Sequence, residues 1–149
     1  MDREEIKRYL NKCTSAQRSV KRLEQDIAQF RAEKMSIRHI MDGMPHASWY
    51  GDLSDYAAKL DELERKLIQA RYERVAIYTD IFDLLEQVED ETYRELLSCR
   101  YLRGYTWDRI ADEMQYCVAQ VHRIHNKALE EVEMICAGKN SIKTVSKRL

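Results

Sequence analysis

Residues 96–132 read LLSCRYLRGYTWDRIADEMQYCVAQVHRIHNKALEEV, and this stretch decides how the chain folds. Gly104 is typical of a residue that ends a helix, and Thr106 is typical of a residue that caps the next one. Apolar residues then recur at helical spacing, residues 115–117 form a turn, and a further helix follows over about 118–135. The pattern predicts two short helices followed by a tight turn and a longer helix.

Two long heptad repeats precede this stretch. Residues 2–41 and residues 53–86 each place apolar or aromatic side chains at nine of ten seam positions. The seam positions are Ile6, Tyr9, Cys13, Ala16, Val20, Leu23, Ile27, Phe30, Lys34 and Ile37 in the first repeat, and Leu53, Tyr56, Leu60, Leu63, Leu67, Ala70, Arg74, Ile77, Ile81 and Leu84 in the second. Each helix would be ~50–60 Å long, and neither apolar stripe can be left in water. We therefore expect a coiled-coil hairpin with antiparallel helices, in which Lys34 falls near Asp61 and Glu62. The two seams leave open whether the hairpin closes within one chain or between two chains, so a homodimer through this arm is also permitted.

A loop is expected between the two long helices, over Asp42–Asp52. Pro45 cannot continue the first helix, and Asp52 or Ser54 can cap the second. A loop this short turns the chain back on itself. All four glycines fall where the helical pattern predicts breaks: Gly43, Gly51, Gly104 and Gly138.

The sequence therefore predicts an all-α fold in three parts. Residues 1–88 form the antiparallel coiled-coil hairpin, and residues 89–137 form a helix-turn-helix module whose first helix is capped by Asp90. Residues 138–149 form a flexible basic tail. The tail has no acidic residue, and it is either an arm that follows DNA phosphates or a frayed terminus. Its cations are Lys139, Lys143, Lys147 and Arg148.

The charge of the chain is unevenly distributed. Residues 1–90 carry 15 Lys and Arg against 18 Asp and Glu, a net charge of −3, whereas residues 91–149 carry 10 against 8, a net charge of +2. This asymmetry fits contact with a polyanion at the C-terminal end. The four cysteines form no CxxC pair, and no signal-peptide or membrane-span pattern is present. We expect a cytoplasmic protein of a bacterial cell.

The helix from Val118 has a polar face with side chains suited to reading DNA. Gln can pair with adenine, Arg with guanine and Ala with the thymine methyl group, while Lys neutralises a phosphate. Acidic residues are absent from 118–129 and return only at Glu130. The alternative interpretation is an ordinary solvated helix face. The candidate DNA-binding residues are Thr106, Arg109, Ala119, Gln120, His122, Arg123, Asn126 and Lys127.

The module resembles region 4 of sigma-70-type factors. More specifically, it is similar to small phage and prophage late-gene activators of the ArpU and RinA type. The resemblance implies a DNA-binding regulator of transcription that acts on double-stranded DNA, with bacterial RNA polymerase as a further partner. In the resembled turns Gly is followed by a Ser or Thr cap, whereas this chain has Gln115 and Cys117. The residues that carry the resemblance are Tyr93, Arg94, Leu96, Leu97, Arg100, Tyr101, Leu102, Gly104, Thr106, Trp107, Ile110, Ala111, Met114, Val121, Ile124, His125, Ala128 and Leu129.

Other functions receive less support from the sequence. Cys117, His122 and His125 lie close in sequence but match no zinc-finger spacing, so no metal or cofactor is predicted. His125 shares a face with Val121 and Leu129 and is interpreted as a half-buried packing residue. No phosphate loop or nucleophile motif is present, so the chain is not expected to be an enzyme. Two alternatives remain open: a small terminase-like DNA-packaging protein, and a coiled-coil adaptor that does not bind DNA.

Overall fold

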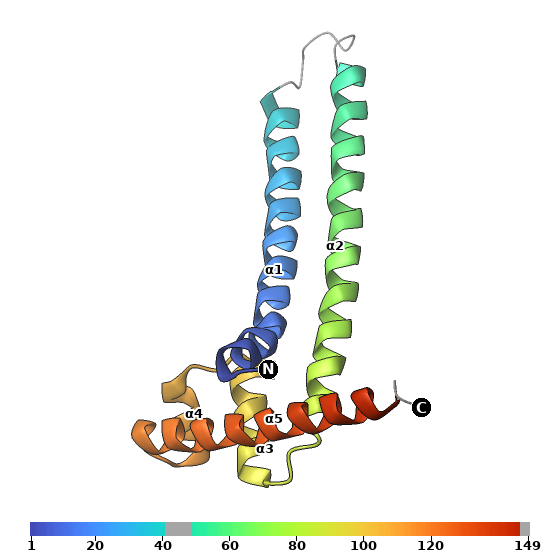
Figure 1. Ribbon diagram of the computed structural model, residues 1–149. Coiled ribbons are helices and arrows are strands. Elements are labelled where there is room, and N and C mark those ends of the chain that lie inside the picture. The colour runs from blue at the N-terminus through green and yellow to red at the C-terminus, as the bar shows by residue number, and fades with distance from the viewer. Residues whose placement is uncertain (41–48, 147–149) are drawn as a thin grey trace. The chain divides into compact units, whose positions relative to one another are not determined.

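The structure is a computed structural model that describes the backbone of residues 1–40 and 49–146 and the side chains of residues 1–35 and 53–138. Within these ranges every regular element is a helix and no strand occurs, which confirms the predicted all-α class. Figure 1 shows the elements in chain order: α1 (Arg3–Ile40), α2 (Trp49–Leu85), α3 (Glu91–Leu97), the π-helical turn η2 (Ser98–Leu102), α4 (Trp107–Met114) and α5 (Val118–Ser146).

The chain forms two compact units. Unit 1 comprises residues 1–15 and 76–149, and unit 2 comprises residues 16–75. Helices α1 and α2 each contribute to both units. This division differs from the predicted boundary after residue 88, because the first turns of α1 and the last turns of α2 pack with the C-terminal helices.

In unit 2, α1 and α2 lie side by side and run antiparallel. Arg31 Nη2 lies 2.7 Å from Glu64 Oε1, and Arg71 Nη2 lies 3.0 Å from Glu24 Oε1. Residue numbers therefore rise along one helix as they fall along the other. Both ion pairs join the two helices of this chain. Two seam positions of α1 are buried in this unit: Val20 and Ile27.

Lys34 makes no ion pair with Asp61 or Glu62 in the part of the chain that the structure describes. Lys34 Nζ lies 4.3 Å from the centroid of the Tyr56 ring, and this ring stacks on Phe30 with the centroids 4.7 Å apart. An aromatic face gives the ammonium a partner without a carboxylate. The two acids instead pair with basic residues on their own helix, which are Lys59, Arg65 and Lys66.

The predicted start of α2 is also wrong. Helix α2 begins at Trp49, so Gly51 and the two predicted caps, Asp52 and Ser54, lie inside the helix. A single glycine costs a helix about 1 kcal/mol, which a helix of this length tolerates. The remainder of the predicted loop, residues 41–48, lies outside the described residues.

The predicted end of the last helix is wrong as well, because a glycine again lies inside a helix that it was expected to end. Helix α5 was expected to end near Ile135 and to be followed by a flexible tail, but it continues through Gly138 to Ser146. No Pro follows Gly138 that would stop the helix. The backbone of the predicted tail is therefore helical up to Ser146.

Three other helix ends lie where the sequence predicts them. The Asp90 side chain accepts a hydrogen bond from the Tyr93 N–H and caps α3. Gly104 has φ +72°, the left-handed conformation that favours glycine. Thr106 Oγ1 accepts a hydrogen bond from the Arg109 N–H and caps α4.

Unit 1 has one main apolar core to which five segments contribute. These segments are the start of α1, the end of α2, the α2–α3 connection, the α3–η2 segment and α5. Removal of apolar side chains from water is the main favourable term in folding, so the start of α1 is an integral part of this unit. The buried residues of this core are Ile6, Leu10, Cys13, Ile81, Leu84, Leu85, Val88, Leu97, Tyr101, Leu102, Ala128, Leu129 and Val132.

A second cluster packs α4 against α5 and the α3–η2 segment. Ala111 is buried within it, as expected for a small residue that lets two helices approach closely. The cluster fixes α4 next to the first turns of α5, where the candidate site lies. Its buried residues are Leu96, Cys99, Ile110, Ala111, Val121 and Ile124.

Candidate nucleic-acid interface

Helix α5 has one buried face and one exposed face over its first turns. The buried residues are Val121, Ile124, His125, Ala128 and Leu129. The predicted DNA-binding residues lie elsewhere on the helix: Ala119, His122, Arg123, Asn126 and Lys127 are exposed, and Gln120 is half-buried. Because the apolar face is held by both clusters of unit 1, the polar face is directed to solvent.

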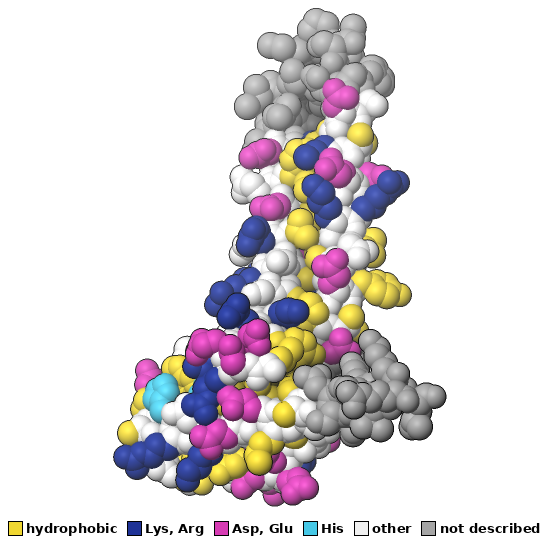
Figure 2. Space-filling view, viewed as in Figure 1, with side chains coloured by type: hydrophobic (Ala, Val, Ile, Leu, Met, Phe, Trp, Pro, Cys, Tyr) yellow, Lys and Arg dark blue, Asp and Glu magenta, His cyan; other side chains and the backbone are white. Residues whose placement is uncertain are grey.

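The cations of this face have no partner among the described residues. No ion pair or side-chain hydrogen bond joins Arg123 or Lys127 to another side chain in the part of the chain that the structure describes. Figure 2 shows Lys and Arg side chains and a His at the end of unit 1 that holds α4, with Asp and Glu side chains nearby. Both cations are therefore available to a ligand.

A three-residue turn from Gln115 to Cys117 joins α4 to α5. Gln115 has φ 58° and ψ 40°, and its N–H donates to the Ala111 carbonyl oxygen. The Tyr116 N–H donates to the same oxygen at 3.1 Å, and the Val121 N–H donates to the Cys117 oxygen at 3.0 Å. Gln115 thus adopts the left-handed conformation that favours glycine.

Replacement of Gln115 by Gly is expected to stabilise the fold by up to about 1 kcal/mol. The left-handed conformation costs an ordinary residue roughly 1–2 kcal/mol, whereas Gly adopts it freely and loses roughly 0.5–1 kcal/mol through the greater freedom of its unfolded chain. Urea unfolding of the two proteins measures the difference. Gln115→Ala keeps the Cβ atom and is the matched control, for which no gain is expected. If the Gly variant were less stable than the wild type, the left-handed backbone at Gln115 would not be strained.

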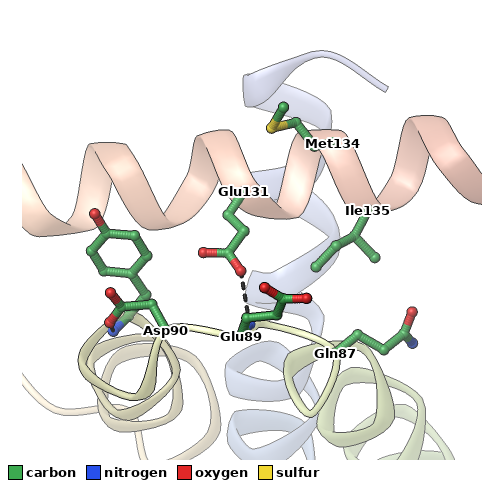
Figure 3. Close-up of a pocket in the computed structure, with 7 residues that line it drawn as sticks. Gln87, Glu89, Asp90, Glu131, Met134 and Ile135 are labelled. Carbon is green, nitrogen blue, oxygen red and sulfur yellow. Dashed lines mark hydrogen bonds between the residues drawn. The ribbon is translucent and has the colours of Figure 1, made fainter.

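The carboxylates of α5 begin at Glu130 and are engaged within unit 1. Arg3 pairs with Glu130 at 3.3 Å and with Glu133 at 3.2 Å. Glu131 Oε1 accepts a hydrogen bond of 2.8 Å from the Glu89 N–H, as Figure 3 shows. Through these ion pairs and this hydrogen bond, the acids join α5 to the start of α1 and to the α2–α3 connection. Their role explains why acidic residues return at this point of the sequence.

A hollow lies beside these contacts, between α5 and the α2–α3 connection (Figure 3). Two of its three carboxylates accept hydrogen bonds from backbone N–H groups. Asp90 accepts from the Tyr93 N–H, and Glu131 accepts from the Glu89 N–H. Within the described residues no group of three or more His, Cys, Asp or Glu is arranged to hold a metal ion. The residues that line the hollow are Gln87, Glu89, Asp90, Tyr93, Glu131, Met134 and Ile135.

A buried pair of polar side chains joins α5 to η2. Tyr101 Oη and His125 Nε2 lie 2.7 Å apart and share a hydrogen bond. The Trp107 ring of α4 contacts both histidines of α5, with its centroid 4.7 Å from that of His125 and 4.5 Å from that of His122. The Arg100 guanidinium lies 4.2 Å from the Trp107 centroid. These contacts fix the rotation of α5 about its axis and so determine which residues face outward.

Burial perturbs both members of this pair. It lowers the pKa of His125 to about 4, with nearby Lys7 and Arg100 acting in the same direction, and it raises the pKa of Tyr101 to about 12. Both groups are therefore neutral at pH 7. His125 is only 5% exposed, so it is more deeply buried than the sequence suggested. Sequence analysis missed its partner, because a separation of 24 residues gives no periodic signal.

The two candidate residues of α4 are exposed but already make contacts. Thr106 Oγ1 accepts from the Arg109 N–H at 3.3 Å. The Arg109 guanidinium lies 3.7 Å from the centroid of the Tyr105 ring, and its Nε lies 3.7 Å from Glu113 Oε1. The structure therefore brings Thr106 and Arg109 together at the start of α4. It leaves Arg109 less available than Arg123.

Comparison with known proteins adds no relative to this description. No family model, curated protein or solved structure matches the chain. None of the described helices combines the length and the apolar composition needed to cross a membrane. Any function must therefore be inferred from the residues of unit 1 and unit 2 themselves.

Proposed function

We propose that this protein is a sequence-specific DNA-binding regulator of transcription that inserts α5 into the major groove. In this proposal α4, the turn and α5 form a helix-turn-helix, and α4 lies across the sugar–phosphate backbone. One observation carries the proposal. Residues 118–129 present Arg123 and Lys127, which are unpaired among the described residues, to solvent and contain no carboxylate that would repel DNA.

Five of the candidate side chains of α5 have a chemical role in this proposal. Arg123 donates two hydrogen bonds to the O6 and N7 atoms of a guanine, and Asn126 or Gln120 pairs with an adenine. Ala119 contacts the methyl group of a thymine. Lys127 neutralises a phosphate, and the N–H groups at the start of α4 beside Thr106 donate to another. Base contacts give sequence preference, whereas phosphate contacts give affinity.

The packing of α5 supports a recognition role. A binding helix must be held within a narrow range of positions, because a loosely held site loses affinity and specificity. The pair formed by Tyr101 and His125 fixes one part of α5, and the ion pairs from Arg3 to Glu130 and Glu133 fix the next turns. The exposed face can therefore meet DNA without first becoming ordered.

The resemblance to sigma region 4 and to phage late-gene activators extends the proposal to transcription. In this extension double-stranded DNA is the main partner, RNA polymerase is the second, and the two long helices act as a coiled-coil arm beside the module. The phage or prophage origin and the late-gene targets belong to the same proposal. They rest on the resemblance and not on the geometry.

The salt dependence of DNA binding tests the phosphate role. Binding of the wild type to duplex DNA is expected to weaken steeply with salt, and Lys127→Ala is expected to weaken binding to all sequences alike while lowering the slope of log K against log[salt] by about 1. Lys59→Ala, which removes an exposed lysine of α2 in unit 2, is the matched control. Fluorescence anisotropy at several salt concentrations measures both slopes. Equal slopes for wild type and Lys127→Ala would show that Lys127 does not contact a DNA phosphate.

A further inference from the structure

The hollow between α5 and the α2–α3 connection takes no part in the proposed DNA contacts (Figure 3). Its volume is about 750 Å³, which is within the range of sites that bind ligands. All seven residues that line it belong to unit 1. The hollow is therefore a feature of one compact unit.

Every charged side chain that lines the hollow is acidic: Glu89, Asp90 and Glu131. Asp90 and Glu131 each accept a hydrogen bond from one backbone N–H, and a carboxylate can accept several. Among the described residues no ion pair joins any of the three to a cation, and Lys127, one turn before Glu131 on α5, makes none with it. The hollow therefore presents negative charge with unused acceptor capacity.

The chain segment that forms one wall of the hollow is acidic beyond the hollow itself. Residues 76–95 contain seven Asp and Glu residues and one basic residue, Arg94. The Arg94 guanidinium is engaged, because its Nε and Nη2 donate to a backbone carbonyl oxygen of the α2–α3 connection at 3.2 and 3.0 Å. Arg3 of α1 also contacts α5, but it pairs with Glu130 and Glu133, which do not line the hollow. These two cations therefore do not neutralise the hollow.

Apolar surface lies beside these carboxylates. Met134 of α5 lines the hollow and is 74% exposed. Tyr93 and Ile135 line it as well and are half-buried. In Figure 3 the side chains of Glu131 and Ile135 extend from α5 towards the connection that carries Glu89. A ligand in the hollow therefore meets acidic and apolar groups together.

This combination of groups determines the class of ligand that fits. Carboxylates repel phosphate groups, so neither a nucleic acid nor an anionic membrane surface suits the hollow. A Lys or Arg side chain forms charge-assisted hydrogen bonds with carboxylates. An apolar side chain next to it would cover Met134 and remove it from water. A protein segment with both kinds of side chain therefore complements the hollow in charge and in polarity.

We propose that the hollow binds a basic segment of another protein. In the bound state a Lys or Arg side chain of this segment contacts Glu89 and Glu131, and a neighbouring apolar side chain covers Met134. The proposal does not depend on DNA binding, since it uses neither Arg123 nor Lys127.

Selection of peptides tests the chemistry of the partner. Random peptides of about 12 residues, displayed on phage, are selected on the full chain, and the most enriched peptide is then used as the probe. The enriched peptides are expected to carry Lys or Arg beside an apolar residue. In fluorescence anisotropy the probe is expected to bind Glu89→Lys at least about tenfold more weakly than the wild type. Asp55→Lys makes the same change of charge at an exposed acid of α2 in unit 2 and is expected to keep the wild-type affinity. Enriched peptides without an excess of basic residues, or equal binding to wild type and Glu89→Lys, would overturn the proposal.

Methionine methyl NMR locates the bound peptide. In the full chain with isotope-labelled methionine, the methyl resonance of Met134 is expected to shift on addition of the probe. The resonance of Met35, an exposed methionine of α1 in unit 2, is expected to stay in place. Met134→Ser is expected to weaken probe binding at least about fivefold, whereas Met35→Ser is the matched control and keeps the wild-type affinity. Both variants are expected to keep the wild-type circular dichroism spectrum, because both side chains are exposed. An unchanged Met134 resonance contradicts binding in the hollow.

Two other occupants of the hollow give different results in the same measurements. A Met134 resonance that shifts with chain concentration, without peptide, would assign the hollow to a second copy of this chain. Tighter probe binding by Lys139→Gln with Lys143→Gln, whose side chains lie outside the described residues, would assign it to the C-terminal residues of this chain. Either result overturns the proposal of a separate basic partner.

Discussion

A change from pH 7 to pH 5 is expected to destabilise the folded protein by about 2 kcal/mol through His125 alone, and by on the order of 3 kcal/mol at pH 4. In the unfolded chain a histidine binds a proton near pH 6.5, whereas burial lowers the pKa of folded His125 to about 4. Between these values the unfolded state binds more protons than the folded state. Stability is therefore fully present above pH 6.5 and is lost as the pH falls towards 4.

Comparison of variants separates this effect from the titration of the carboxylates. Urea unfolding of wild type and His125→Gln at pH 7, 6 and 5 measures the difference between the two proteins at each pH. The variant is expected to be less stable at pH 7, because it disturbs the contact with Tyr101, and to lose less stability on acidification. His122→Gln replaces the exposed histidine of the same helix. On acidification this variant is expected to lose as much stability as the wild type does. Parallel pH profiles for wild type and His125→Gln would show that His125 does not cause the loss.

Replacement of Arg123 by Ala is expected to cost about 1–3 kcal/mol of binding to the preferred duplex, which is roughly a 5- to 150-fold loss of affinity. Arg123 is exposed and unpaired among the described residues, so its guanidinium can donate to both acceptors of a guanine. Without it the preference at that base pair is expected to relax. Selection from a randomised duplex pool identifies the preferred sequence, and anisotropy with single-base variants of that sequence measures the loss.

The same experiment with Arg18→Ala provides the control. Arg18 is an exposed arginine of α1 in unit 2, so its removal lowers the net charge equally but is expected to leave base preference unchanged. Gln120→Ala is expected to relax the preference at a neighbouring base pair. If both Arg123→Ala and Gln120→Ala kept the wild-type affinity and preference, α5 would not be the recognition helix.

Local signals were sufficient to predict several ends of the short helices. The caps Asp90 and Thr106 and the helix stop at Gly104 act within a few residues, so the sequence alone locates them. The helical period likewise separates the buried Val121 and Leu129 from the exposed polar residues of α5. For these elements the deciding interactions lie within one or two helical turns.

Interactions between distant segments could not be predicted in the same way. Leu10 lies outside the predicted heptad seam, yet it is fully buried, because the start of α1 contributes to a core shared with α3, η2 and α5. The contact of Lys34 with the Tyr56 ring was not predicted, because it depends on how α1 packs on α2. The hydrogen bond between Tyr101 and His125 depends on how α5 packs on η2. Gly138 shows that one residue of low helix propensity does not end a helix by itself.

Amide chemical-shift mapping of the full chain with its selected duplex tests most directly whether α5 reads DNA. The largest changes are expected at residues 118–127 and at Thr106 to Arg109, with little change in residues 16–75. Changes concentrated in residues 16–75, or none at low salt, would contradict the proposal that the exposed face of α5 is the DNA-binding surface.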